Sequence, residues 1–518
     1  MRRIGIDVGG TNTDAVLLDG DRVLHAVKTP TTPDVTSGIV TALRMLTDVR
    51  GETGAGLTAP VTAIMIGTTH FTNAIVQRRD LVPVAAIRIG LPASASLPPF
   101  VDWPEDLAGI VRGDVFMLEG GHEYDGRPLV PFDSTGMRRV ARRIREAGLR
   151  SVGIASVFSP LNAACEEEAA AILRQEYPDA AVTLSHQLGR IGLLERENVT
   201  LLNAALVDLA RRTTRAFVDA LAASGIAAPL YLTQNDGTVM LASVAEAFPV
   251  YSFASGPTNS MRGAAFLSKR ADALVIDVGG TTTDIGSLRH SFPREANNVV
   301  EIGGVRTLFR MPDLLSLGLG GGSVVREQPL AIGPQSVGYR LTQQALVFGG
   351  RELTATDVAV AAGLVDLGDR GRVASLPAAL VSAALARIRA MIDEGVDRMK
   401  ADASEVPLIA VGGGCFLVPD SIPGISEVVH VEHGPVANAV GAAIAQVSGE
   451  EDRIFQNLSR EEAIAEARRL AEDKAVRAGA DPRTLGVVEV EDLPIAYLPG
   501  NSLRARVRVV GDIRAHAA

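Results

Sequence analysis

Two nearly identical stretches of sequence constrain the fold of this chain more than any other feature. Residues 7–14 read DVGGTNTD and residues 277–284 read DVGGTTTD, and the apolar residues on both sides also align without gaps. The offset of 270 residues, from Asp7 to Asp277, is far longer than the period of about 20–50 residues that marks a solenoid. The repeat therefore predicts a duplicated domain rather than a stacked array.

Each copy has the residues of a turn that can bind phosphate. The apolar strand before the turn ends at an aspartate, and the two glycines let the chain turn where a Cβ atom would clash. Their backbone N–H groups can point inward as an anion-binding nest, and Thr11, Asn12 and Thr13 add hydroxyl and amide donors. An apolar strand then returns, so each copy predicts a β-hairpin around a phosphate site.

Two such hairpins facing one another across a cleft would bind both ends of a triphosphate chain. An aspartate at the end of each strand can hold Mg²⁺ through water, since Mg²⁺ keeps much of its hydration shell in proteins. The alternative is a pair of unrelated hairpins with glycine-rich turns. Two near-identical copies, each at the end of a strand, favour the phosphate-binding interpretation.

Two further glycine loops lie in the second half of the chain. Residues 408–415 read LIAVGGGC, a strand that runs into Gly412, Gly413 and Gly414. This turn suits the close approach of a purine ring or a ribose, or it is a tight connection between a strand and a helix. Residues 318–323 read GLGGGS, a loop that either contacts phosphate or is mobile.

Composition limits the classes of function. The 518 residues are 47% apolar and 21% charged, which predicts two or three packed domains. The net charge of −10 argues against nucleic-acid binding, which needs a basic face, and favours a small molecule or a protein as partner. Two distant cysteines, Cys165 and Cys415, cannot build a disulfide framework, so a reducing cytoplasm is expected. No apolar run reaches the roughly 18 residues of a membrane helix, so no membrane association is expected.

The order of expected elements is α/β in both halves. Short strands and helices alternate up to about residue 190, except that residues 92–131 read as an irregular inserted loop region. A long helix over residues 196–223 leads into a second half with the same pattern, and a mixed-charge helix and two strands come last. We therefore predict two lobes and a small C-terminal α/β tail, at residues 1–190, 191–449 and 450–518.

These features together resemble a known group of proteins. Paired hairpins and a late strand with a triple-glycine turn are similar to the superfamily of actin, sugar kinases and heat-shock-chaperone ATPases, whose domains are ribonuclease H-like. More closely, over about residues 1–449, the sequence resembles the A-type subunits of the hydantoinase/oxoprolinase family. Apart from the hairpins, the stretches that match are GTTHFTNAIVQRR (67–79), LLERENVTLLNAAL (193–206), LTQNDG (232–237), SGPTNSMRGA (255–264), GLGGGS and IGPQSVG (332–338).

The resemblance implies duplicated actin-like ATPase domains that flank a nucleotide cleft, and an enzyme that uses ATP and Mg²⁺. In the family, ATP phosphorylates the carbonyl oxygen of a cyclic amide, such as a hydantoin, 5-oxoproline or another lactam, and the activated ring is hydrolysed. An amide is a poor electrophile until its oxygen becomes a leaving group, and catalysis is then mostly positioning and charge neutralisation. An oligomer with a separately encoded B-type subunit is also implied.

Carried onto this sequence, the resemblance implies a nucleotide site. The first phosphate loop would consist of Asp7, Gly9, Gly10, Thr11, Asn12 and Thr13, and the second of Asp277, Gly279, Gly280, Thr281, Thr282 and Thr283. Gly412, Gly413 and Gly414 would lie near the adenosine. Asp7 and Asp277 would be the catalytic carboxylates that organise Mg²⁺ or water. Asp14 and Asp284 either fix the hairpins or reach the metal.

The chain departs from the longer family members at two places. About 70 residues follow Gly449, where longer members carry a sizeable extra region, and IGPQSVG is followed by YRLTQQALVFGG instead of a loop rich in Gly, Pro and Cys. These differences leave the ATP site intact but leave open the substrate and the need for a B-type subunit. Two alternatives also stay open: a small-molecule kinase of the same fold, and a non-catalytic ATPase switch that reactivates a partner enzyme.

Five other residues have two interpretations each. His70 and His186 follow strand-like segments and either face a substrate or metal, or are hydrogen-bonded structural histidines. Cys415 is either a nucleophile or a small buried residue. Asn235 and Asp236 end a strand, where they either face the cleft or shape the turn.

Overall fold

A computed structural model of the chain describes residues 2–9, 12–30, 35–47, 60–189, 191–296, 300–309, 311–495 and 501–514. Helices and strands are mixed throughout these residues, which confirms the predicted α/β class. Gly10 and Thr11, two members of the predicted first phosphate loop, lie outside the described residues.

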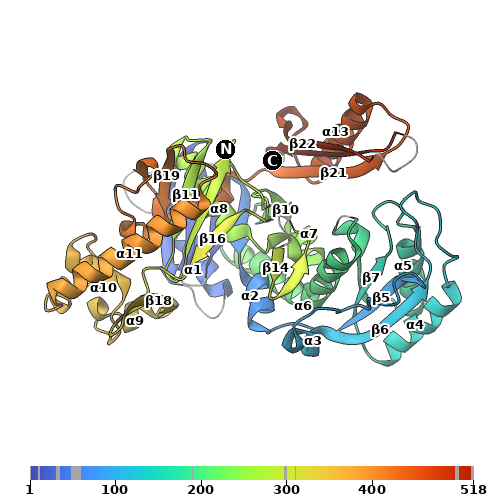
Figure 1. Cartoon of the computed structure of the whole chain (residues 1–518), viewed down its shortest axis with the longest axis horizontal. Helices are drawn as coiled ribbons and strands as arrows, with labels where there is room; N and C mark the ends of the chain where they lie inside the picture. Colours follow the sequence, from blue (N-terminus) through green and yellow to red (C-terminus); the bar gives the residue numbers. More distant parts are fainter. Residues whose placement is uncertain are drawn as a thin grey trace.

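The first copy of the repeat lies in a nine-stranded sheet (Figure 1). The copy itself is an antiparallel hairpin of β1 (Arg2–Val8) and β2 (Asn12–Asp19), and β3 (Arg22–Pro30) pairs antiparallel with β2. On the other side of β1 lie β4 (Val61–Thr68) and then β9 (Leu230–Thr233), each parallel to its neighbour. This part of the sheet has the order β3-β2-β1-β4-β9.

The second copy lies in a separate six-stranded sheet that is arranged in the same way. The hairpin is formed by β11 (Ala273–Val278) and β12 (Thr283–Arg289), and β16 (Leu314–Leu317) pairs antiparallel with β12. On the other side, β19 (Val406–Val411) and β20 (Ile425–His430) are added in parallel. The order β16-β12-β11-β19-β20 repeats the order and the directions of the first sheet, which confirms the predicted duplication.

Two helices that touch through glycines join the sheets. The helix α12 (Ala437–Ile444) packs on the β1–β2 hairpin, and α8 (Ser255–Ser268) packs on β11 and β19. A Cβ atom added to Gly263 would lie 1.9 Å from the Ala437 carbonyl oxygen, and one added to Gly441 would lie 1.8 Å from the Asn259 carbonyl oxygen. The helix backbones are therefore in direct contact, with no room for a side chain between them.

An inserted lobe carries a four-stranded parallel sheet of order β6-β5-β7-β8. The strands β5 (Val84–Leu91), β6 (Arg112–Glu119), β7 (Ser151–Ser156) and β8 (Ala181–Leu184) are covered by α4 (Ser134–Glu146) and α5 (Ala164–Glu176). The prediction that residues 92–131 are irregular was wrong in part, because this stretch contains α3 (Glu105–Val111) and β6. Buried Leu107 and Val111 hold α3, and parallel pairing with β5 holds β6.

A C-terminal module stands apart from both lobes in Figure 1 and is joined to the nine-stranded sheet at one residue pair, Val239 with Val447. The short strand β10 (Val239–Leu241) connects β9 to β21 (Val447–Phe455), and β23 (Leu503–Gly511) and β22 (Gly486–Pro494) follow. One face of β23 packs on the alanines of α13 (Arg460–Arg477). The predicted boundaries at residues 190 and 449 stay predictions, and the hydrogen-bonded sheet crosses both positions.

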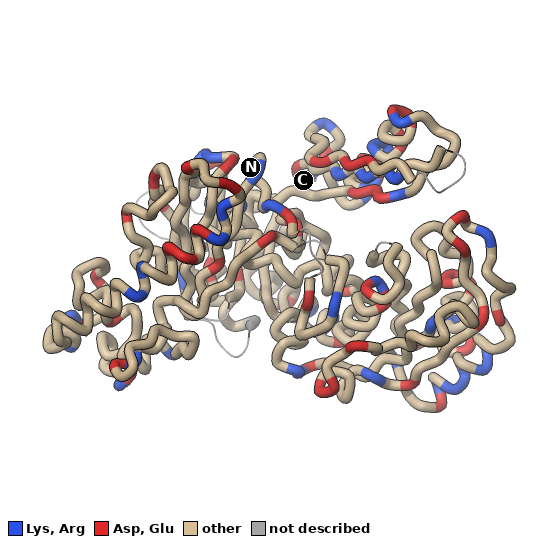
Figure 2. The backbone as a smooth tube through the Cα atoms, viewed as in Figure 1, with Lys and Arg blue, Asp and Glu red and all other residues tan. Residues whose placement is uncertain are grey.

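The opposite face of β23 carries three arginines, Arg504, Arg506 and Arg508, that are paired with carboxylates. Arg504 pairs with Asp452 and Arg508 with Asp236, while Arg506 lies within 4 Å of four glutamates. Charges of both signs are accordingly interspersed over this module (Figure 2).

Among the described residues, no helix combines the length and the apolar character that crossing a membrane requires.

Candidate functional site

The two hairpin turns have the same backbone hydrogen bond. The Gly9 N–H donates to the Asn12 carbonyl oxygen at 3.0 Å, and the Gly279 N–H donates to the Thr282 carbonyl oxygen at 2.9 Å. In the second turn, Thr281 and Thr282 are exposed at the tip. Both turns thus lie at the carboxyl end of a parallel strand, where α/β proteins bind phosphate and other ligands.

The last threonine of each predicted phosphate loop is buried in its own hairpin. Thr13 and Thr283 are 1% and 0% exposed. The Thr283 hydroxyl donates to the Leu319 carbonyl oxygen at 2.7 Å, and the Thr29 hydroxyl donates to the Thr13 carbonyl oxygen at 3.3 Å. These two threonines therefore fix the hairpins to the neighbouring chain.

The GLGGGS loop at residues 318–323 supports the second turn. The Gly321 N–H donates to the Gly279 carbonyl oxygen at 3.0 Å, and the Gly322 N–H donates to the Gly280 carbonyl oxygen at 2.7 Å. A Cβ atom added to Gly320 would lie 2.6 Å from the Thr281 nitrogen. The loop is therefore a backbone support of the turn, so it is neither free nor separate from the site.

The triple-glycine turn after β19 also packs on the second hairpin. Gly412 has a φ of +89°, and a Cβ atom at this position would lie 2.2 Å from Asp277 Oδ1. The Gly414 N–H donates to the Val278 carbonyl oxygen at 2.7 Å. Gly413, between them, is exposed. The structure thus brings Gly412–Gly414 and the second hairpin together, while their place near an adenosine stays a prediction.

Strand register places four carboxylates in two facing pairs. Asp7 lies opposite Asp14 in the first hairpin, and Asp277 lies opposite Asp284 in the second. Asp7 and Asp14 are 5% and 4% exposed. Asp284 accepts a hydrogen bond of 2.5 Å from the Ser316 hydroxyl.

Burial raises the pKa of all four carboxyl groups above the ordinary value for aspartate. Burial raises the pKa of Asp7 to about 7, and the charges of Asp14 and Asp277 add to this rise, while Lys28 opposes it. Burial also raises the pKa of Asp14 and of Asp277, and it raises the pKa of Asp284 to about 6. The charge of Asp277 acts on Asp7, so the carboxylates of two hairpins from different sheets lie in one cluster.

Three residues that the sequence analysis missed complete this cluster. Lys28 Nζ lies 2.7 Å from the Asp14 carboxylate, and its charge also lowers the pKa of Asp7 and Asp277. The Asn438 amide donates to Asp7 at 3.1 Å, and the nearby Ser260 hydroxyl opposes the rise that burial causes in the pKa of Asp277. Register offers a signal for Lys28, which lies directly opposite Asp14 on β3.

The cluster fits a nucleotide triphosphate with Mg²⁺. Glycines leave space beside Asp277, and the buried carboxylates lie around one lysine, so a divalent cation would offset their mutual repulsion. In the part of the chain that the structure describes, no three His, Cys, Asp or Glu residues are grouped to hold a metal. Mg²⁺ needs only one or two carboxylates, because water and phosphate oxygens complete its coordination.

The histidines and the cysteine have defined surroundings. His70 begins α2 (His70–Gln77), directly after β4, and burial lowers its pKa. His186 Nδ1 lies 2.7 Å from a carboxylate oxygen of the fully buried Glu166. Burial, with Asp277 nearby, raises the pKa of the half-buried Cys415, which disfavours a thiolate nucleophile.

Asn235 and Asp236 shape the turn after β9. The Asn235 amide donates to the Val250 carbonyl oxygen at 3.1 Å and accepts from the Ala254 N–H at 2.7 Å. Asp236 accepts from the Thr238 N–H at 3.0 Å. The turn is therefore rigid, and it borders a cavity that is described below.

We expect the stability of the metal-free and nucleotide-free protein to fall as the pH rises from about 4 to about 7. The pKa of Asp7 is higher in the folded protein than its ordinary value of 3.8, so folding favours the protonated carboxyl and must bury a charge at higher pH. At roughly 1.4 kcal/mol per pKa unit, the loss is on the order of 3 kcal/mol. Urea unfolding in EDTA at pH 5 and pH 8 measures it. Asp7→Asn should reduce the change in stability between pH 5 and pH 8. If the change is as large in that variant as in the wild type, Asp7 is not its source.

Two family models match this chain. The model of the hydantoinase/oxoprolinase N-terminal region matches residues 3–177, and the hydantoinase/oxoprolinase model matches residues 196–369. The acetophenone carboxylase gamma subunit of Aromatoleum aromaticum is 28% identical over 396 residues, which are 71% of this chain and 54% of that protein. The caprolactamase alpha subunit of Pseudomonas jessenii is 27% identical over 398 residues, which are 70% of this chain and 54% of that protein. The chain thus spans about half the length of these curated relatives.

Two solved structures share the fold over nearly the whole chain. The ATP-dependent caprolactamase from Pseudomonas jessenii aligns with a TM-score of 0.76 at 20% identity and covers 99% of this chain and 88% of that one. A nucleotide-free acetone carboxylase aligns with a TM-score of 0.71 at 17% identity and covers 99% and 89%. This likeness confirms the predicted fold class of duplicated actin-like ATPase domains.

Proposed function

We propose, because this chain belongs to the hydantoinase/oxoprolinase family, that it is an ATP-dependent hydrolase of a cyclic amide or the ATP-using subunit of one. The observation that carries the proposal is the meeting of both repeated hairpins at one lysine. Lys28 pairs with Asp14 in the first hairpin, and its charge reaches Asp277 in the second. Two glycine turns that face one charge cluster from different sheets fit a nucleotide triphosphate between them.

The residues around this cluster have separate proposed roles. The N–H groups of both turns bind the phosphates, and Lys28 neutralises part of their charge. Asp7 and Asp277 hold Mg²⁺ through water, with Asn438 and Ser260 orienting them. Gly412–Gly414 border the nucleoside, since the exposed Gly413 leaves a flat surface beside the second turn.

When bound, ATP would supply a phosphoryl group to the carbonyl oxygen of the ring, so that ADP leaves and two water molecules then open the ring and release phosphate. The chain contributes position and charge. It holds the acceptor oxygen in line with the transferred group and keeps the carboxylates from repelling the phosphates, which is the main work of phosphoryl-transfer sites.

A separately encoded B-type subunit is part of the proposal. The two curated relatives are named as gamma and alpha subunits, and this chain spans about half of each. We propose that the active assembly is a hetero-oligomer in the cytoplasm.

The proposal predicts that a cyclic amide stimulates ADP release by at least roughly tenfold, because the acceptor completes the site for phosphoryl transfer. The assay measures ADP release with hydantoin, N-methylhydantoin, 5-oxoproline and simple lactams, with and without a B-type partner. If no ring stimulates ADP release in either setting, the proposal fails. A stable phosphorylated product by mass spectrometry would identify a kinase, and slow turnover that is independent of any ring would identify an ATPase switch.

A further inference from the structure

A cavity of about 460 Å³ lies at the carboxyl end of β9. Several distant parts of the chain meet there, among them residues 186–189 of the inserted lobe, residues 234–236 after β9, residues 308–309, and residues 448–450 of β21. Ligands of open α/β sheets bind in crevices at the carboxyl ends of the strands. The volume is within the range of about 300–1,000 Å³ that is typical of small-molecule sites.

The cavity lies beside the carboxylate cluster along the same edge of the sheet. β1, β4 and β9 are neighbours, so two strand spacings, or roughly 10 Å, separate the ends of β1 and β9. Between them, a Cβ atom added to Gly67 would lie 2.8 Å from Asp7 Oδ1 and 3.3 Å from Thr233 Oγ1. The cavity begins at the next residue, Gln234. The cavity and Asp7 therefore lie at the same edge of the sheet, with the buried Gly67 and Thr233 between them.

The walls of the cavity suit a small ring with one polar edge. Met240, Val244 and Phe309 are apolar lining residues, against which methylene groups would lose contact with water. Gln234 and Tyr251 also line the cavity; the Gln234 amide donates to the Thr238 hydroxyl and the Tyr251 hydroxyl to the Gln187 carbonyl oxygen, which leaves their oxygens as acceptors. This is the chemistry of a cyclic amide, which has an apolar ring with one N–H and one carbonyl group.

Among the described residues, the lysine and the histidine that line the cavity already lie beside carboxylates. Lys474 Nζ lies 2.7 Å from Glu451 Oε2 and donates to the Glu450 carbonyl oxygen at 2.9 Å. His186 Nδ1 lies 2.7 Å from Glu166, and its Nε2 lies 3.2 Å from Glu167. A ligand carboxylate entering this cavity would lose its hydration without gaining a described unpaired cation, which is costly.

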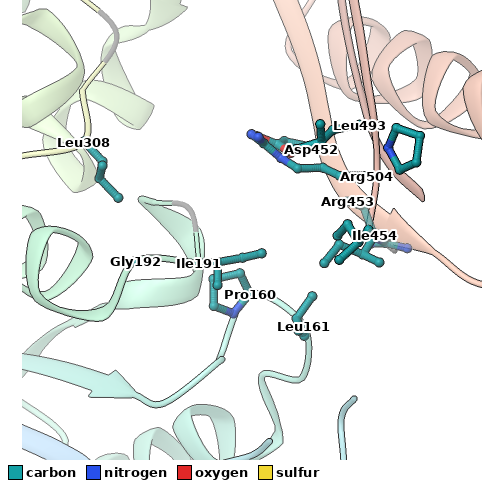
Figure 3. Close-up of a pocket in the computed structure, with 12 residues that line it drawn as sticks. Pro160, Leu161, Ile191, Gly192, Leu308, Asp452, Arg453, Ile454, Leu493 and Arg504 are labelled. Carbon is teal, nitrogen blue, oxygen red and sulfur yellow. Dashed lines mark hydrogen bonds and ion pairs between the residues drawn. The ribbon is translucent and has the colours of Figure 1, made fainter. Parts of the chain in front are cut away.

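A second, more apolar cavity of about 380 Å³ adjoins the first (Figure 3). Pro160 and Leu161 of the inserted lobe face Ile454 of the C-terminal module across it. Leu308 and Asp452 line both cavities. The groove between the inserted lobe and the C-terminal module therefore leads to the end of β9.

We infer that the cavity at the end of β9 binds the phosphoryl acceptor and selects uncharged cyclic amides over rings that carry a carboxylate. The inference rests on the proposed function and narrows its substrate class to neutral lactams. The groove shown in Figure 3 is the entrance for the ring.

A matched pair of rings tests the selectivity. 5-Oxoproline is 2-pyrrolidinone with a carboxylate added, so both have the same ring and the same amide. We expect kcat/KM for ring-stimulated ADP release to be at least roughly tenfold higher with 2-pyrrolidinone, equivalent to about 1.4 kcal/mol. A preference for 5-oxoproline would overturn the inference while leaving the proposed function standing.

Substitutions at Val244 test the location. Val244 is 37% exposed, so a larger side chain there narrows the cavity without entering the core. Val244→Trp should raise KM for 2-pyrrolidinone at least roughly tenfold by occupying ring volume. Val244→Lys adds an ammonium group to the wall and should shift the preference toward 5-oxoproline. The matched control is Val218→Trp on α6 (Leu193–Ala223), which is 48% exposed and should leave both rings unaffected.

Direct binding separates this inference from the proposed function. Ligand-observed NMR without ATP reports whether 2-pyrrolidinone binds the wild-type chain and whether Val244→Trp weakens the binding. Weakened binding in Val244→Trp supports the cavity as the site of ring binding. If no ring then stimulates ADP release, only the proposed function is contradicted. Equal binding or equal KM in wild type and Val244→Trp, with urea midpoints unchanged, would overturn the inference.

Discussion

Replacing Asp277 by asparagine is expected to lower ATP turnover at least ~100-fold, the size of effect seen when one preorganised electrostatic group is removed from a transition state. The carboxylate lies at the end of β11 and against the triple-glycine turn. The charge of Lys28 lowers the pKa of this carboxylate. Asparagine has nearly the same shape but no charge, so it cannot hold Mg²⁺ through water as a carboxylate does. Single-turnover ADP formation with saturating ATP measures the effect.

The variant should not unfold the protein, because burial already disfavours the Asp277 charge and raises the pKa of its carboxyl group. We expect its urea midpoint to equal or exceed that of the wild type at pH 8. The control is Asp284→Asn, the partner of Asp277 in strand register, which accepts a hydrogen bond from Ser316 and should lose less activity. Unchanged turnover in Asp277→Asn would remove this residue from the site.

Gly441→Ala is expected to destabilise the protein by about 3 kcal/mol or more, the upper part of the range for overpacking. The added methyl group would lie 1.8 Å from the Asn259 carbonyl oxygen, so α8 and α12 must separate. Neither helix can relieve this clash by a side-chain rotation, since the contact is with backbone atoms. Because α12 packs on the first hairpin and α8 on the strand of Asp277, this separation also moves Asp7 away from Asp277, so ATP turnover should fall together with stability.

Gly109→Ala provides the matched control for this variant. Gly109 also lies in a helix, α3, but a Cβ atom added there has no other atom within 4 Å. Alanine should therefore leave stability unchanged or raise it by roughly 0.4–1 kcal/mol through the unfolded state. Urea unfolding of both variants compares them, and a Gly441→Ala variant as stable as the wild type would show that the helices separate without cost.

Local sequence patterns predicted the repeated hairpins because a hairpin is encoded by adjacent residues. Apolar runs, two glycines and small polar residues specify both turns. The two hairpins also occupy equivalent places in the strand order of their sheets. The pairing of distant strands has no such signal. Because β6 pairs with the distant β5, and β21 meets β10 at Val239 and Val447, no local pattern predicts an ordered stretch within residues 92–131 or a C-terminal module joined to the first sheet.

The candidate site divides in the same way. The aspartates and glycines of the turns could be predicted, and Lys28 could have been found from its position across from Asp14. Asn438 and Ser260 could not, because only the packing of α12 on the first hairpin and of α8 on β11 brings them to the carboxylates. Several segments that lie far apart in the sequence line the cavity at the end of β9, so no single motif predicts it.

The nine-stranded sheet joins segments that a ribosome makes at very different times. β4 pairs with β9, as in Ile64 with Leu230, and β10 pairs with β21, as in Val239 with Val447. During synthesis, β4 emerges long before β9 is made, so the β4 edge that pairs with β9 stays unpaired, and unpaired strand edges are prone to aggregate. Such long-range pairing also slows folding. Overproduction of this chain should therefore depend on chaperone capacity and on slow translation more than on the stability of the finished fold.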